Sequence, residues 1–348
     1  MNTAIKPIDK NWLERALERQ NRLTKPPGSL GFLEEIGVQL AAIQKTFKPR
    51  LERGAVIVCA ADHGVTAQGV SAYPPEVTPQ MVMNFLAGGA AINQIARVCD
   101  AEVYVLDAGV RGGLPAHPRL IEAKLRQGSG NIALRAAMTR SQAEKAIRAG
   151  MDAARPALEE GATILAAGDM GIGNTTAAAA LTAALLGLDA EAVTGRGTGV
   201  DDVGYRRKLE VVRTSIHRAR TVLGDFTQAD PIDLLAQLGG LEIAAIAGVF
   251  LAGAEAGIPL VTDGFPVTAG ALLACRIDPL VRDYLFAGHR SVEPGHSLQL
   301  EALVLRPVLE LGLRLGEGTG AVLSFSVLRA AAAVLSMATF EEAGVSGG

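Results

Sequence analysis

The sequence predicts a doubly wound α/β fold, with a mainly parallel sheet and a small helical subdomain built from both ends of the chain. Short apolar runs rich in β-branched residues alternate with segments of helical apolar spacing. Each run ends in a polar residue beside glycine. The chain has 348 residues, which is enough for one large domain and an accessory domain.

Five apolar runs have the length and composition of fully buried strands. Each leads into a polar or ionisable residue next to glycine, as Asp62-His63-Gly64 follows the first run. Ligands of an open parallel sheet bind beyond the carboxyl ends of its strands. We therefore expect the five ends to meet at one rim and to share a site. The runs are Ala55–Ala60, Val103–Leu106, Thr163–Ala167, Ile258–Thr262 and Tyr284–Ala287.

Segments with i, i+3, i+4 apolar spacing predict helices between these runs, which indicates a Rossmann-like sheet covered on both faces. The expected helices are Met81–Val98, Thr139–Leu158, Thr175–Leu186, Tyr205–Leu223 and Asp233–Glu255. Three more are expected near the chain ends, over Asn11–Leu23, Gln299–Leu313 and Thr319–Thr339. We therefore predict an α/β catalytic domain over residues 25–298 and a helical subdomain from residues 1–24 and 299–348.

Composition and charge exclude several classes of protein. Hydrophobic residues make up 49% and charged residues 20%, which favours a folded core over disorder. The net charge is −3 and no basic patch predicts a nucleic-acid partner. We expect neither a membrane span nor a signal peptide, because no sufficiently long apolar segment is present. Cys59, Cys99 and Cys275 are widely spaced, which favours free thiols and a cytoplasmic location.

Two small-residue loops have the character of an anion site. Gly168–Thr176 follows a predicted strand and opens an alanine-rich helix, so backbone N–H groups and the helix dipole can face a phosphate. The loop lacks Gly-Lys-Ser/Thr and a complete dinucleotide fingerprint. A tight turn capped by Asn174 or Thr175 is the alternative. Thr194–Gly199 is the second loop, and it precedes the helix that contains Lys208.

Lys208 is a candidate cation for such a phosphate, although Arg206, Arg207 and Lys208 together could equally form a solvated helix face. Glu317 lies between two glycines just before the last long helix. Its carboxylate is unshielded, and the alternative role is a dipole-favoured acid at the helix start.

The histidines do not predict a metal site. His63, His117, His217, His289 and His296 form no H-x-x-x-H or H-E-x-x-H pair. His63 and His289 end predicted strands, where they could bind substrate or serve as hydrogen-bonded structural residues. The residues alone therefore indicate an α/β enzyme that binds a phosphorylated metabolite at the rim of its sheet.

Seven motifs in register resemble the nicotinate-nucleotide:dimethylbenzimidazole phosphoribosyltransferase family, and they extend from residue 25 to residue 321. They are Lys25–Gly31, Ala61–Val65, Gly168–Thr176, Gly195–Gly199, Asp263–Phe265, Gly288–His296 and Leu313–Ala321. The resemblance implies an enzyme of cobalamin synthesis that transfers the phosphoribosyl group of nicotinate mononucleotide to 5,6-dimethylbenzimidazole. It also implies a homodimer that requires no metal or organic cofactor.

The resemblance also assigns roles to individual residues. Glu317 corresponds to the general base, which removes a proton from the benzimidazole as it attacks C1′ with inversion. Asp169 stands where the family often has Glu, at the acceptor site, and Asp263 and Ser291 lie in rim motifs. Tyr73, Met81 and Leu315 are candidates for the apolar acceptor slot. The phosphate loops contribute Gly171, Gly173, Asn174, Thr175, Gly197, Thr198 and Lys208.

Three other functions remain open at this point. A phosphoribosyltransferase of the same fold could use another base or a phenol, because sequence does not resolve the shape of the acceptor pocket. A non-catalytic nucleotide-binding regulator is disfavoured by the presence of Glu317. A nicotinamide-dependent dehydrogenase is disfavoured by the incomplete dinucleotide fingerprint.

Overall fold

The computed structural model describes residues 3–346 and contains a single seven-stranded sheet in the order β3-β2-β1-β4-β5-β6-β7. Every neighbouring pair of strands is parallel. The prediction of a doubly wound parallel α/β fold is therefore confirmed. The strands are β1 Gly54–Ala61, β2 Ala101–Gly109, β3 Leu120–Glu122, β4 Ile164–Met170, β5 Leu260–Thr262, β6 Leu285–His289 and β7 Pro307–Leu309.

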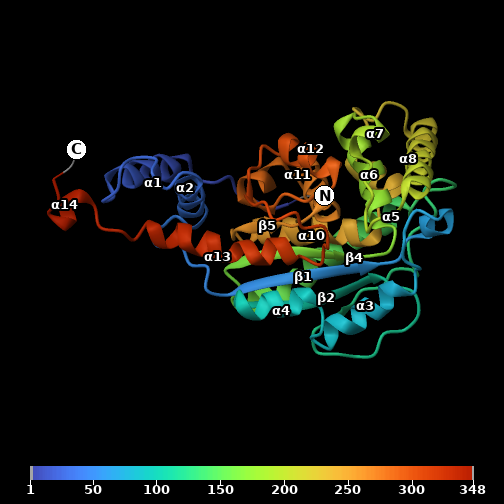
Figure 1. Ribbon diagram of the computed structural model, residues 1–348, viewed down its shortest axis with the longest axis horizontal. Helices are drawn as coiled ribbons and strands as arrows, with labels where there is room; N and C mark the ends of the chain where they lie inside the picture. Colours follow the sequence, from blue (N-terminus) through green and yellow to red (C-terminus); the bar gives the residue numbers. More distant parts are fainter. Residues whose placement is uncertain (1–2, 347–348) are drawn as a thin grey trace.

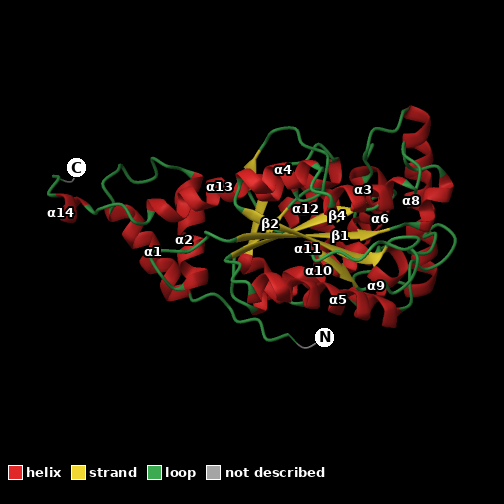
Figure 2. Cartoon of the chain, turned by 90° about the horizontal axis from the view of Figure 1, so that it is seen from below, coloured by secondary structure: helices red, strands yellow, loops and turns green. Residues whose placement is uncertain are grey.

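Helices cover both faces of the sheet, with α3, α4 and α13 on one side and α5 and α10 on the other (Figures 1 and 2). The helices of ten or more residues are α1 Lys10–Arg22, α2 Phe32–Gln44, α3 Val77–Leu86, α5 Arg140–Glu159, α6 Asn174–Leu186, α8 Asp202–Leu223, α10 Leu241–Glu255, α11 Phe265–Ile277 and α13 Thr319–Val334. The shorter ones are α4 Ala91–Val98, α7 Ala190–Val193, α9 Pro231–Leu238, α12 Pro294–Ala302 and α14 Phe340–Ala343. None of the described helices is long and apolar enough to cross a membrane.

The strand order reverses direction between β1 and β4, and this reversal indicates where a ligand would bind. From β1 the chain proceeds to β2 and β3 on one side, and from β4 it proceeds to β7 on the other. In sheets with such a reversal, ligands bind beyond the carboxyl ends of the strands on either side of it, which are β1 and β4 here. Asp62 and His63 follow β1, and the loop that begins at Gly171 follows β4.

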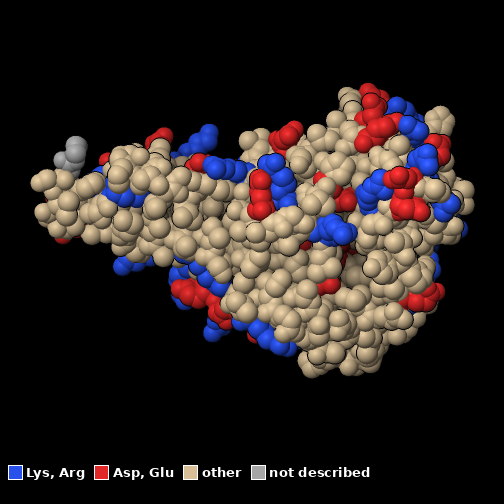
Figure 3. All heavy atoms as spheres, in the orientation of Figure 1, with Lys and Arg blue, Asp and Glu red and all other residues tan. Residues whose placement is uncertain are grey.

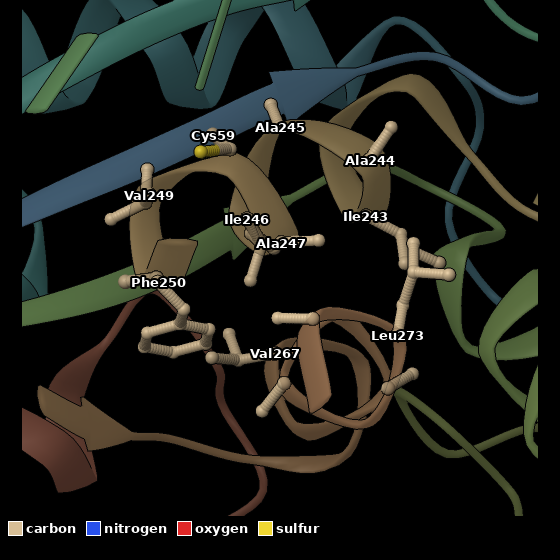
Figure 4. Close-up of a cluster of buried hydrophobic side chains, with 14 of the residues drawn as sticks. Cys59, Ile243, Ala244, Ala245, Ile246, Ala247, Val249, Phe250, Val267 and Leu273 are labelled. Carbon is tan, nitrogen blue, oxygen red and sulfur yellow. The ribbon is translucent and has the colours of Figure 1, made fainter. Parts of the chain in front are cut away.

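Helix α10 is buried on all sides because it lies between the sheet and the outer helices. In Figure 4, Ala245 and Val249 lie on the side of Cys59 in β1, whereas Phe250 lies beside Val267 of α11. Helix α5 packs against α10 through glycines, since a Cβ atom added at Gly248 would lie 1.9 Å from the carbonyl oxygen of Ile147. Small side chains therefore set the distance between these helices.

Helices α1, α2 and the C-terminal part of α13 form a helical extension away from the strand ends that hold the site (Figure 1). Helix α1 packs on α2, and α2 packs on α13. Arg19 Nε donates to the carbonyl oxygen of Leu335 at 2.9 Å, and Leu23 forms an antiparallel bridge with Thr339. We retain the division into residues 25–298 and a subdomain from 1–24 and 299–348 as a proposal.

Several predicted elements are wrong in their extent. The helix expected over 299–313 ends at Ala302, and the chain then forms β7, because Pro307 cannot continue a helix and disfavours helical backbone before it. The helix expected over 81–98 is α3 and α4, separated at Gly88-Gly89, and the helix expected over 233–255 is α9 and α10, separated at Gly239-Gly240. Periodicity alone did not identify β3, β7, α2 or α11.

We expect Gly248→Ala to lower the free energy of unfolding by about 1–3 kcal/mol, because the added methyl group overpacks the contact between α10 and α5. In an unobstructed helix the same change would stabilise the protein by about 1 kcal/mol, so the sign of the effect tests the packing. Urea unfolding provides the measurement.

Gly113→Ala is the matched control, because a Cβ atom there meets no atom within 4 Å. A Gly248→Ala variant as stable as the wild-type chain would show that the two helices can separate without cost.

Candidate active site

A cavity of about 80 Å³ lies at the rim, beyond the ends of β4 and β6. Figure 3 shows the molecule hollowed in this region, with acidic side chains visible inside. A wider cavity of about 580 Å³ lies at the opposite ends of β1 and β2, and none of the predicted site residues lines it. Eight of the predicted residues line the rim cavity, namely Asp169, Gly171, Asn174, Thr175, Gly197, Thr198, Ser291 and Leu315.

The two glycine loops converge on Lys208. Its Nζ donates to Thr175 Oγ1 at 2.8 Å, at the start of α6. A Cβ atom at Gly197 would lie 3.1 Å from the same Nζ, so the second loop approaches from the other side. Gly173 and Gly197 have φ values of 93° and 55°, a left-handed backbone that glycine adopts without strain.

Lys208 is buried, whereas Arg206 and Arg207 are exposed. The interpretation of all three as a solvated face is therefore wrong for Lys208. Burial lowers the pKa of the Lys208 ammonium to about 8, and the negative charge of Glu293 opposes this shift. A buried cation between two glycine loops can bind an anion strongly, because little water competes with it.

Glu317 lies in a strained loop. Gly316, Glu317 and Gly318 have φ values of 85°, 64° and 88°, and a non-glycine residue rarely adopts this region. The loop crosses β4 so closely that a Cβ atom at Gly168 would lie 2.3 Å from the Glu317 carbonyl oxygen. The sequence folds this way because glycines precede and follow the glutamate.

The Glu317 loop leads into α13, but the carboxylate of Glu317 points to the start of α4. Glu317 Oε2 accepts a hydrogen bond from the backbone N–H of Ile92 at 3.2 Å, in the first turn of α4. Burial raises the pKa of this carboxyl, the Ile92 hydrogen bond opposes the rise, and the charge of Asp263 adds to it. A carboxyl with a raised pKa is a stronger base than one in water.

Asp263 is fully buried and fixes the Glu317 loop. Its Oδ2 accepts from the backbone N–H of Gly318 at 3.1 Å, and its Oδ1 accepts from that of Ala321 at 2.9 Å. His289 Nε2 lies 3.3 Å from Oδ1, and this carboxylate raises the pKa of the imidazole against the effect of burial. The structure thus places Asp263 under the loop, and its predicted contact with substrate stays a prediction.

Asp169 is also buried, and its Oδ2 accepts from Asn174 Nδ2 at 2.6 Å. Burial raises the pKa of Asp169 to about 8, and the charges of Asp263, Glu242 and Glu317 contribute to the rise. At neutral pH this side chain therefore keeps its proton.

The remaining predicted residues occupy different environments. The Ser291 side chain is buried and accepts from the backbone N–H of Glu293 at 3.4 Å. Leu315 is exposed at the mouth of the cavity. Tyr73 precedes α3 and Met81 lies within it. Neither residue lines the cavity, and Tyr73 is 53% exposed.

Some residues of the site were not predicted. Glu293 lines the cavity, and its Oε1 accepts from the backbone N–H of Gly197 at 2.9 Å. Its place in the motif Gly288–His296 was the signal that could have identified it. His63 is a structural residue beneath the first glycine loop, since its Nε2 lies 2.7 Å from the buried Glu242 Oε1. Cavity residues that sequence reasoning did not assign also include Met170, Phe265 and Arg314.

No group of three or more His, Cys, Asp or Glu side chains in the described chain is arranged to hold a metal ion.

Comparison with known proteins identifies the family of this chain. A family model described as a phosphoribosyltransferase matches residues 5–345. The chain belongs to this family. A Thermus thermophilus protein named nicotinate-nucleotide--dimethylbenzimidazole phosphoribosyltransferase is 61% identical over 98% of this chain and 100% of the relative. Relatives of the same name from Deinococcus radiodurans and Chromobacterium violaceum are each 51% identical, over 99% and 100% of this chain and 94% and 99% of their own length.

A solved structure supports the family assignment. The crystal structure of CobT from Thermus thermophilus has a TM-score of 0.94 at 61% identity, and the match covers 97% of this chain and all of the other. The resemblance predicted from the seven motifs is thus confirmed, and the chain is a phosphoribosyltransferase. This assignment also counts against the dehydrogenase and the non-catalytic regulator.

The raised pKa of Asp169 predicts how stability depends on pH. Between about pH 4 and pH 8 the folded phosphoribosyltransferase keeps a proton that the unfolded chain releases, so this group makes the free energy of unfolding fall as pH rises. We expect Asp169→Asn to remove about 1–3 kcal/mol of this decline between pH 5 and pH 8. Urea unfolding at both pH values measures it.

Asp152→Asn, on the exposed face of α5, is the control and should retain the pH dependence of the wild-type chain. The same decline in Asp169→Asn and wild type would contradict a buried, protonated Asp169.

Proposed function

We propose that this chain transfers the phosphoribosyl group of nicotinate mononucleotide to 5,6-dimethylbenzimidazole, with Glu317 as the general base. The main observation is the geometry of Glu317, whose buried carboxylate is held by a strained loop over β4. The first glycine loop extends from the end of the same strand. The names of the relatives support the same substrates.

The reaction explains why one strong base suffices. The bond between C1′ and the pyridinium nitrogen of nicotinate breaks, and its electron pair leaves with a neutral pyridine ring, so the leaving group needs no general acid. One benzimidazole nitrogen bonds to C1′ from the opposite face, which inverts the β-riboside to an α-riboside. The proton on the other nitrogen moves to Glu317, which prevents positive charge from accumulating on the acceptor. The products are α-ribazole 5′-phosphate and nicotinate.

The donor's phosphate is proposed to bind where Lys208 meets the glycine loops. Backbone N–H groups, the start of α6 and a buried ammonium are favourable partners for a phosphate dianion. This half of the site fixes the donor so that C1′ faces the acceptor. The residues proposed to contact the phosphate are Gly171, Gly173, Asn174, Thr175, Gly197, Thr198 and Lys208.

The acceptor side is proposed to include Asp169, Tyr73, Met81 and Leu315. Asp169 keeps its proton near neutral pH, so the proposal assigns the role of base to Glu317 and not to Asp169. The bond energy resides in the donor, so the proposal requires neither a metal nor an organic cofactor. Another benzimidazole or a phenol as native acceptor is the alternative, and it predicts release of nicotinate with those acceptors in place of 5,6-dimethylbenzimidazole.

We also propose a cytoplasmic homodimer. The three cysteines are unpaired, which suits a reducing compartment. Exposed Leu17 of α1, Tyr73 and Leu315 are apolar side chains that a second copy of the chain could cover. Light scattering should give twice the subunit mass of 36.1 kDa, and a single subunit mass at micromolar concentration would contradict the dimer.

We expect Glu317→Ala to lower kcat for nicotinate release by roughly two to four orders of magnitude, as loss of a general base does. The affinity for nicotinate mononucleotide should stay close to that of the wild type, because the base contacts the acceptor and not the phosphate. The assay follows nicotinate with and without 5,6-dimethylbenzimidazole, and calorimetry measures donor binding.

Lys208→Ala should give the opposite pattern. Loss of the buried ammonium is expected to raise KM for the donor about 10–100-fold, as loss of a charged hydrogen bond does. If Glu317→Ala lost donor affinity, or if Lys208→Ala left KM unchanged, the two halves of the site would be wrongly assigned.

A further inference from the structure

A carboxylate lies inside the site proposed for the phosphate. Glu293 precedes α12, lines the rim cavity and is 6% exposed. Its Oε1 accepts the backbone N–H of Gly197 at 2.9 Å. Its Oε2 is buried and has no hydrogen-bond partner among the described residues.

The contact with the second glycine loop is close. A Cβ atom at Gly195 would lie 2.2 Å from Glu293 Oε2, so only glycine lets the carboxylate approach the loop backbone. Gly197 has a φ of 55° and directs its N–H group to Glu293 Oε1. Backbone N–H groups of this kind otherwise bind phosphate oxygens. Glu293 therefore occupies a donor that a phosphate would use.

Glu293 also balances the charge of Lys208, which lies across the same loop. Lys208 Nζ donates to Thr175 Oγ1 at 2.8 Å, and Glu293 is the negative charge that acts on it. One buried positive and one buried negative charge give a net charge of zero. An incoming phosphate dianion is thus attracted by Lys208 and repelled by Glu293.

We propose that Glu293 is an internal counter-anion of the phosphate cradle, which neutralises Lys208 in the free protein and limits the affinity of the cradle for phosphate monoesters. The role in turnover rests on the proposed function, in which donor and product both carry the phosphate. A cradle of unopposed positive charge would retain the phosphorylated product. Glu293 is in this sense a residue that tunes release and not a catalytic residue.

Glu293→Gln separates this proposal from a purely structural role. Glutamine has the same shape and keeps an oxygen for the Gly197 N–H group, while the negative charge is lost. If Glu293 only held the loop, its replacement would leave phosphate binding unchanged or weaken it. If Glu293 opposes the phosphate, its replacement strengthens binding.

The experiment is calorimetric titration of inorganic phosphate into the full chain, without acceptor. We expect Glu293→Gln to lower the Kd for phosphate by about tenfold or more, from the removal of one like charge in a poorly hydrated site. Glu301→Gln, on the exposed face of the same helix, makes the same change in net charge and should bind as the wild type does. Unchanged or weaker binding in a folded Glu293→Gln variant would overturn the proposal.

Glu293→Gln leaves Lys208 buried without its counter-charge, which can destabilise the fold. A second comparison tests the proposal if this variant does not fold. Lys208→Gln and the double variant Lys208→Gln/Glu293→Gln differ only at residue 293, and the double variant buries neither charge. The double variant should bind phosphate more tightly than Lys208→Gln, and equal or weaker binding would refute the proposal. If the wild type did not release nicotinate, the proposed reaction would be wrong. The phosphate titration would still test the role of Glu293, because it needs no turnover.

Discussion

The burial of several carboxyl groups at one rim is the constraint on which the rest of the structure depends. Bulk water cannot solvate Asp169 at the end of β4, Asp263 after β5, Glu242 at the start of α10 or Glu317 in its loop over β4. A buried acid requires hydrogen-bond donors, a counter-charge or a proton. Asp263 accepts hydrogen bonds from two backbone N–H groups at the start of α13, and Glu317 accepts one at the start of α4. Glu242 pairs with His63, whereas Asp169 keeps its proton.

These requirements fix the arrangement of the helices. Helices α4 and α13 begin beside the acids, so their positive ends offset the negative charge. Helix α6 begins at the same rim but directs its first turn to the cavity, where Thr175 meets Lys208. Close packing at this rim also requires glycine at two positions. Gly168 and Gly318 leave room for the Glu317 loop to cross β4, where any side chain would collide with backbone or with Val56.

The sequence predicted the sheet and part of the cavity lining because local signals determine both. Buried strands, glycine turns and the order of the motifs can be recognised within a few residues, and they located Thr175, Gly197 and Lys208 correctly in relation to one another. Contacts between distant segments could not be predicted in this way. Glu293 reaches Gly197 across 96 positions, and Asp263 reaches Gly318 across 55, so neither contact has a local signal. Helix α11 was missed because its first ten residues are all buried, which removes the apolar periodicity.

The distribution of charge along the rim also suits a transfer between two sites. At the glycine loops, a buried cation and its counter-anion leave backbone donors and a net charge close to zero before a ligand enters. At the Glu317 loop, acids outnumber cations, and Asp169 retains a proton because burial, and then the charge of Asp263, oppose its ionisation. Burial raises the pKa of Glu317 and the charge of Asp263 adds to the rise, so this carboxylate has a higher affinity for a proton than one in water. One end of the rim is thus suited to holding an anion and the other to receiving a proton, which is the division of roles that the proposed transfer requires.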